Sequence, residues 1–264
     1  MQIVTDGKAY YEKAVLALGM FDGVHIGHRV LLERAKVLAR RGGVPLVACT
    51  FTGHPLELIA PDRCPPMLTT FEERASLLEE LGVDMLFAQP FTEEMRQMPP
   101  EVYVGELIRR FHPVDVVCGY NHTFGKGGTG TSAFLAALGD ALGFRTQIVP
   151  QVTLDGAEVS SSAIRSAISQ GDLKTATQLL GRPYDFAGEL FCSENNVVLF
   201  RRERDGKLGL SEGRYRCILQ QNDQPAAVPC VSVVNESNSY RLLLAVKNKS
   251  QQAKLIVLTK INKN

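Results

Sequence analysis

The chain has 264 residues, 45% of them hydrophobic and 22% charged, which suits one large or two smaller globular domains. A net charge of +1 excludes the strongly basic surface of a protein that binds nucleic acid mainly through its phosphates. The chain has neither a signal-peptide pattern at its start nor an apolar run of the roughly 20 residues that span a membrane, so we expect a cytoplasmic protein without a membrane partner.

β-Rich apolar runs alternate with helical patterns between residues 14 and 149. The expected strands are 14–18, 44–51, 83–88, 114–118 and 144–149. Thr70 and Glu73 form a capping box at the start of one helix, and Pro99 and Pro100 begin another. This alternation predicts an α/β fold with a doubly wound parallel sheet, whose ligands bind beyond the carboxyl ends of the strands.

The stretch 19–28, Gly-Met-Phe-Asp-Gly-Val-His-Ile-Gly-His, lies where the first of these strands gives way to a helix. The first-turn amides of a helix are unpaired and the helix dipole is positive there, so the site favours an anion such as a phosphate chain. A single histidine near a helix start is more often a cap, and a single glycine is usually a turn. Three glycines, an aspartate and two histidines, His25 and His28, within ten residues favour function over packing.

Three later stretches also follow an expected strand or open a helix. Residues 160–165, Ser-Ser-Ser-Ala-Ile-Arg, are either a simple helix cap or a second anion site, in which Arg165 grips phosphate oxygens. Residues 119–125 form a Gly-rich loop, a weak signal alone, and residues 52–55 form a loop that contains His54. The six cysteines are far apart, with no Cys-x-x-Cys pair, which favours buried thiols over a zinc site or disulfides.

Together these stretches resemble a known family. The form Phe-Asp-Gly-x-His-x-Gly-His resembles the signature of the nucleotidyltransferase superfamily, and more narrowly the adenylyltransferase module of bacterial FAD synthetases. Residues 160–165 are similar to that family's Ser-Ser-Thr-x-Ile-Arg element, with Ser162 in place of Thr. Residues 51–55 are similar to its Phe-x-Pro-His-Pro, with Gly53 in place of Pro. Residues 179–184 resemble the exit into the riboflavin kinase domain, so the resemblance covers about residues 14–190.

The resemblance implies roles for individual residues. His25, His28 and Arg165 are the expected catalytic residues, which stabilise the triphosphate and the leaving pyrophosphate. Asp22 is expected to shape its loop, or to help order a metal through water, rather than act as a base, and His122 is no more than a candidate. ATP is expected to contact Gly19, Met20, Phe21, Asp22, Gly27, Asn121, Ser161 and Ser162, and FMN to contact His54, Pro55 and Phe124.

After Pro183 the pattern changes to strand-like runs separated by turn residues, with expected strands at 197–200, 215–219, 228–234, 240–246 and 255–261. We expect a first domain at 1–183 and a small antiparallel β domain or barrel at 184–264. In bifunctional family members this barrel carries a Pro-Thr-Ala-Asn element for metal and phosphate. Thr259 is the only threonine after Pro183 and no Pro-Thr pair occurs, so the tail resembles a shortened kinase barrel without its catalytic loop.

The resemblance therefore implies an FMN adenylyltransferase that makes FAD and pyrophosphate from FMN and ATP with Mg²⁺, and the changed tail predicts that this chain does not phosphorylate riboflavin. A phosphate monoester has a second pKa of about 6, so this acceptor needs no general base. Two alternatives stay open: transfer to another phosphate-monoester acceptor, or a flavin or nucleotide sensor that has lost catalysis. The sequence does not indicate the oligomeric state.

Overall fold

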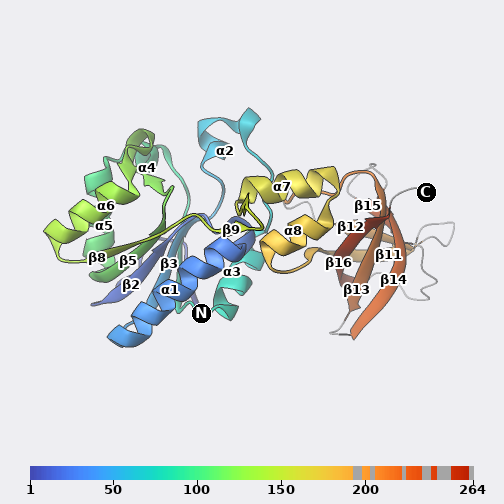
Figure 1. The fold of residues 1–264 in the computed structure, drawn as a ribbon, viewed down its shortest axis with the longest axis horizontal. Helices are drawn as coiled ribbons and strands as arrows, with labels where there is room; N and C mark the ends of the chain where they lie inside the picture. Colours follow the sequence, from blue (N-terminus) through green and yellow to red (C-terminus); the bar gives the residue numbers. More distant parts are fainter. Residues whose placement is uncertain (193–197, 203–205, 222–223, 234–238, 243–250, 262–264) are drawn as a thin grey trace. The chain divides into compact units, whose positions relative to one another are not determined.

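A computed structural model describes residues 1–192, 198–202, 206–221, 224–233, 239–242 and 251–261 (Figure 1). The chain forms two compact units, Met1–Glu158 and Val159–Asn264. Helices α7 (Ser161–Gln170) and α8 (Leu173–Leu180) belong to the second unit, so the two units divide before the expected domain boundary at 183. Position 183 instead directly precedes the first strand of the barrel, β11 (Tyr184–Cys192).

The first unit contains the predicted doubly wound sheet, with six parallel strands in the order β1-β4-β3-β2-β5-β8. Their bounds are β1 (Gln2–Val4), β2 (Ala14–Leu18), β3 (Leu46–Phe51), β4 (Met85–Gln89), β5 (Pro113–Gly119) and β8 (Arg145–Val149). The chain runs outward from β2 through β3 to β4, then crosses to β5 and β8 on the other side of β2. The strand order therefore reverses between β2 and β5, and this switch point is where such folds bind ligands.

Helices cover both faces of this sheet (Figure 1). Successive residues of β2 point to opposite faces: Val15 and Ala17 pack with α1 (Ile26–Gly42) and α3 (Phe71–Glu80), and Leu16 and Leu18 pack with α5 (Pro100–Phe111) and α6 (Ser132–Leu142). All five residues of β2 are buried, as expected for a parallel strand covered on both sides.

The helix boundaries follow local signals in the sequence. Thr70 and Glu73 form the predicted capping box at the start of α3. Helix α1 ends at Gly43, whose φ of 61° lies in the left-handed region that favours glycine. The remaining short elements of the first unit are η1 (Asp22–Val24), α2 (Leu56–Ile59), η2 (Pro61–Arg63), α4 (Glu93–Gln97), β6 (Thr123–Phe124), η3 (Lys126–Gly128), β7 (Gly130–Thr131), β9 (Thr153–Leu154) and β10 (Ala157–Glu158).

The second unit consists of α7, α8 and a closed barrel with the strand order β11-β12-β15-β14-β13-β16. The further strands are β12 (Val198–Arg202), β13 (Gly213–Gln221), β14 (Gln224–Val233), β15 (Ser239–Leu242) and β16 (Gln251–Ile261), and all pairs are antiparallel, as predicted. Parts of the strands expected at 197–200, 228–234 and 240–246 lie outside the described residues. None of the helices in the described ranges has the length and apolar character that a membrane crossing requires.

Candidate functional site

Three of the predicted loops lie at the carboxyl ends of neighbouring strands of the first unit. Residues 19–28 follow β2 and are here called the donor loop, after the ATP contacts expected there. Residues 52–55 follow β3 and are here called the acceptor loop, after the FMN contacts expected there. The Gly-rich loop 119–125 follows β5. Because β3, β2 and β5 are adjacent and parallel, the sheet brings all three loops to one edge, at the switch point.

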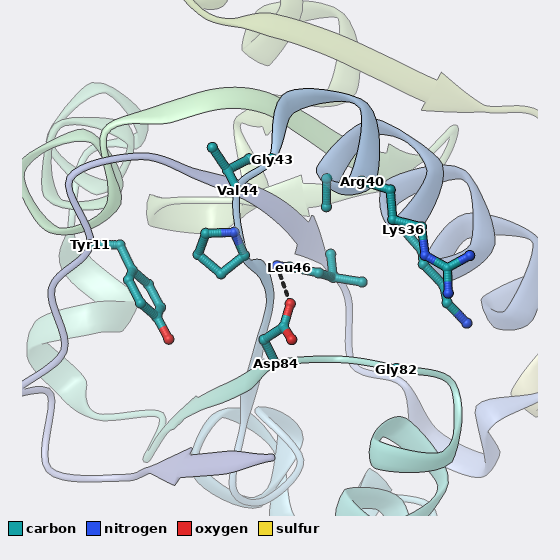
Figure 2. Close-up of a pocket in the computed structure, with 10 residues that line it drawn as sticks. Tyr11, Lys36, Arg40, Gly43, Val44, Leu46, Gly82 and Asp84 are labelled. Atoms are coloured by element: carbon teal, nitrogen blue, oxygen red, sulfur yellow. Dashed lines mark hydrogen bonds between the residues drawn. The ribbon is translucent and has the colours of Figure 1, made fainter.

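The cavity in Figure 2 lies at the opposite edge of the sheet. It has a volume of about 570 Å³ and is lined by Tyr11, Lys36, Arg40 and the residues that precede or begin β3 and β4. The Asp84 carboxylate there accepts a 2.8 Å hydrogen bond from the Leu46 amide, the first of β3. These are amino ends of strands and the carboxyl end of α1, so this cavity is not where the motif loops meet.

The two histidines of the donor loop contact each other directly. His25 caps α1, and its Nδ1 accepts a hydrogen bond of 3.3 Å from the His28 amide. The two imidazole rings are stacked, with centroids 3.6 Å apart and planes at 16°. Acceptance at Nδ1 places the proton of a neutral His25 ring on Nε2, which is then a hydrogen-bond donor. The predicted pair is thus a preorganised unit at the head of α1.

His28 is held neutral by its surroundings. Burial, then the neighbouring His25 and Arg74, lower the pKa of His28 well below its usual value of 6.5. The edge of the Phe21 ring lies against it, with centroids 5.4 Å apart. Within the described residues, the buried Nδ1 of His28 has no hydrogen-bond partner. A neutral imidazole with an unused nitrogen suits hydrogen bonding to a phosphate oxygen, without a fixed positive charge.

The backbone of the donor loop is strained and held by a buried carboxylate. Phe21 and Val24 have φ of 52° and 39°, in the left-handed region that such residues seldom adopt. Asp22 is 2% exposed and accepts hydrogen bonds from the amides of Leu68 and Thr69 at 2.9 Å and 3.2 Å. Asp22 therefore shapes its loop, as the sequence analysis expected, and its carboxylate is occupied with backbone donors.

Sequence reasoning missed Arg74, which lies on the buried face of α3 and is 1% exposed. Its Nη1 donates to the Met20 carbonyl at 2.8 Å, and its Nη2 donates to the Phe51 and Thr52 carbonyls at 2.7 Å and 3.0 Å. A signal did exist, because Arg74 stands one helical turn before Leu78 on the face that the apolar pattern assigned to the core.

The acceptor loop is ordered by local hydrogen bonds. His54 Nδ1 accepts from the Leu56 amide at 3.1 Å, and the His54 amide donates to the Glu57 carboxylate at 3.2 Å. Pro55 precedes the single turn α2. Gly53 is closely approached by the Glu57 side chain, and an added Cβ there would lie 2.6 Å from a carboxylate oxygen. The imidazole of His54 is thus fixed, half-buried, at the carboxyl end of β3.

In the Gly-rich loop, exposed and buried residues alternate. Asn121 is exposed, whereas Phe124 is 8% exposed and packs in the core against Tyr103, with ring centroids 5.4 Å apart. His122 is stacked on Phe124 at 5.7 Å, and burial lowers the pKa of His122 to about 4. The predicted FMN contact of Phe124 stays a prediction. Its visible role is to anchor the β6–β7 hairpin, where Gly130 leaves room for the Phe124 ring.

The serine-rich stretch belongs to the second unit. Ser160 caps α7 by accepting a 3.2 Å hydrogen bond from the Ala163 amide, which confirms the capping role. Ser161, Ser162 and Arg165 lie in the first turns of that helix, partly or fully exposed. Their expected meeting with the histidine pair around one triphosphate stays a prediction, as do their contacts with ATP.

The sheet order defines the first unit as a doubly wound α/β domain, and the histidine pair at the head of α1 lies at its switch point, in a position that favours an anion. The model of the FAD synthetase family matches residues 7–163. The chain therefore belongs to the FAD synthetase family.

Relatives with curated names support the same family. A bifunctional riboflavin kinase/FMN adenylyltransferase of Listeria monocytogenes is 36% identical over 175 residues, which cover 66% of this chain and 55% of the relative. The Bacillus subtilis protein of the same name is 34% identical, with coverages of 67% and 56%. The Escherichia coli K12 protein is 32% identical, with coverages of 69% and 59%. The chain thus matches little more than half the length of these relatives.

A solved structure agrees with the fold. The chain is similar to the crystal structure of a macrolide-efflux protein from Streptococcus pneumoniae, with a TM-score of 0.87 and 22% sequence identity. The similarity covers 100% of this chain and 91% of the other. At this level of identity the likeness shows a shared fold and nothing about activity.

Proposed function

We propose that this protein is an FMN adenylyltransferase. An oxygen of the FMN phosphate attacks the α-phosphorus of ATP, the bond from that phosphorus to the β-phosphate oxygen breaks, and FAD and pyrophosphate result. The observation that carries the proposal is the stacked histidine pair at the head of α1, in a chain of the FAD synthetase family. Such transfer depends mainly on positioning and on electrostatic stabilisation of the phosphates.

The residues have separate tasks in this reaction. His25 and His28 donate hydrogen bonds to the triphosphate, together with the first-turn amides of α1. Ser161, Ser162 and Arg165 hold the β- and γ-phosphates that leave as pyrophosphate. His54 and Pro55 contact the FMN phosphate, and Asn121 lies toward the adenosine. The FMN phosphate is already largely ionised at neutral pH, so no side chain has to remove a proton.

Mg²⁺ enters with ATP as part of the substrate. Within the described residues, no group of three or more His, Cys, Asp or Glu side chains is arranged to hold a metal ion. The Asp22 carboxylate accepts from the amides of Leu68 and Thr69. These residues fit a Mg²⁺ ion that is held mainly by phosphate oxygens and water, which is its usual coordination in nucleotide-dependent enzymes.

The barrel supports the second part of the proposal, that riboflavin is not phosphorylated by this chain. Its sequence lacks the Pro-Thr pair of the kinase element. Cys49 and Cys118 are buried free thiols, which suits the reducing cytoplasm where we place the protein.

The deciding experiment incubates the purified protein with ATP, Mg²⁺ and FMN and separates the flavins by chromatography while pyrophosphate is measured. Formation of FAD and pyrophosphate in equal amounts is expected, with no FMN from riboflavin and ATP. Other phosphate monoesters are tested in parallel, because Gly53 in the acceptor loop departs from the family pattern. Pyrophosphate release with one of these but not with FMN would transfer the proposal to that acceptor. Tight binding of ATP or FMN with no turnover would indicate a sensor instead.

A further inference from the structure

The guanidinium of Arg74 joins two loops that the proposed reaction keeps for different substrates. Met20, whose carbonyl accepts from Nη1 at 2.8 Å, belongs to the donor loop. Thr52, whose carbonyl accepts from Nη2 at 3.0 Å, begins the acceptor loop, and Phe51 ends β3. One planar group therefore hydrogen-bonds the segments at the carboxyl ends of two adjacent strands, β2 and β3.

The presence of an arginine at position 74 indicates that this side chain does more than fill the core. Arg74 lies on the inner face of α3 among the apolar residues Phe71, Ala75 and Leu78, at a position where the pattern calls for an apolar side chain. Burying a guanidinium is costly unless its donors are well placed. Among the described residues no carboxylate lies at ion-pair distance from Arg74; all its hydrogen-bonded partners are backbone carbonyls. A leucine or methionine side chain would fill the space without the cost of burying a charge.

We propose that Arg74 is a positioning residue that fixes the distance between the donor loop and the acceptor loop. This inference rests on the proposed function for its consequence, since in-line transfer needs the attacking oxygen about 3–3.5 Å from the phosphorus. The guanidinium fork sets both nitrogens in one rigid plane, which a flexible ammonium does not do. Thr50 also helps to fix this distance, because its Oγ1, within β3, donates a 3.1 Å hydrogen bond to the Met20 carbonyl.

The test is Arg74→Lys, which keeps the charge near His28 and loses the fork. We expect kcat to fall by roughly 10- to 100-fold while the KM values for ATP and FMN change by no more than about threefold, because each loop still holds its own substrate. The matched control is Arg145→Lys, which loses a bidentate pair with Asp115, at 2.9 Å and 2.7 Å, between β5 and β8. The control is expected to keep wild-type kcat. A wild-type kcat in Arg74→Lys, or a loss confined to the KM of one substrate, would overturn the proposal.

A second measurement does not depend on FAD formation. Hydrogen–deuterium exchange of the amides in residues 19–22 and 52–54 is expected to rise in both loops of Arg74→Lys and in neither loop of Arg145→Lys. If the wild-type protein makes no FAD, the proposed function fails, and exchange alone still decides the bridging role. Exchange that is unchanged, or raised in one loop only, contradicts that role whatever the activity.

Thr50→Val provides a variant in case Arg74→Lys does not fold. It removes the hydroxyl that bonds the Met20 carbonyl and keeps the shape of the side chain. We expect a smaller fall in kcat, unchanged KM values and faster exchange in the donor loop. Wild-type kcat together with wild-type exchange in this variant would count against a fixed spacing of the two loops.

Discussion

Protonation of His122 is expected to destabilise the protein in acid. Its ring is stacked on Phe124, and its Nε2 is buried without a hydrogen-bond partner in the described part of the chain. Burial lowers the pKa of His122 from 6.5 to about 4, so the unfolded chain takes up the proton first as pH falls. Stability is therefore lost between about pH 6.5 and about pH 4 and changes no further below that range on account of this group.

The size of the effect follows from the pKa interval. At about 1.4 kcal/mol per pKa unit, the interval from 6.5 to about 4 corresponds to at most about 3 kcal/mol. The pKa of His28 is also lowered, which adds a loss of the same sign. His122→Phe keeps an aromatic ring against Phe124 and removes only the His122 contribution.

The assay is urea-induced unfolding of the wild-type protein and His122→Phe at several pH values between about 7 and about 4. The free energy of unfolding of His122→Phe should gain on that of the wild type by up to about 3 kcal/mol as pH falls through this range. The imidazole resonances of the five histidines, followed by NMR, report the pKa directly. Parallel stability curves for the two proteins, or a His122 resonance that titrates near pH 6.5, would refute the reasoning.

Two further predictions concern catalysis and packing. His28→Ala should lower kcat by about 10²- to 10³-fold, as for loss of one oxyanion donor, whereas His112→Asn, at the amino end of β5, should retain wild-type turnover in the same assay. Equal turnover in both variants would remove His28 from the site. Gly139→Ala should destabilise by about 1–3 kcal/mol, because its Cβ would lie 2.7 Å from the Phe144 carbonyl oxygen, while Gly105→Ala, with open space, should stabilise by about 0.5–1 kcal/mol. Thermal unfolding monitored by circular dichroism measures both, and the same sign for the two glycines would contradict the packing account.

The sheet could be predicted from the sequence because its strands are buried on both faces. The expected strand 14–18 coincides with β2, and the other four expected strands overlap β3, β4, β5 and β8. β1 was not expected, since it has three residues of which only Val4 is buried, and so carries little apolar pattern. Its place beside β4 comes from tertiary pairing, which no local signal encodes.

The donor loop shows where sequence reasoning stops. Spacing placed His25 and His28 at the head of a helix, because capping and strand-to-helix transitions are local. The lowered pKa of His28 depends on burial, on His25 and on Arg74, and Arg74 lies on another element, α3. Chemistry-bearing residue types were thus predictable, whereas their protonation was not.

The supporting residues of the site are harder to predict than the residues they support. Asp22 accepts hydrogen bonds from amides 46 and 47 residues further along the chain, and Arg74 donates to a carbonyl 54 residues before it. Neither contact has a periodicity or a spacing to detect, because the partners are backbone atoms that any residue supplies. What a sequence does show is a charged residue on an otherwise apolar helix face. Arg74 is such a residue, and it bonds the strand ends that carry the donor and acceptor loops. A charged residue on an apolar helix face therefore indicates that backbone groups from other elements bind it.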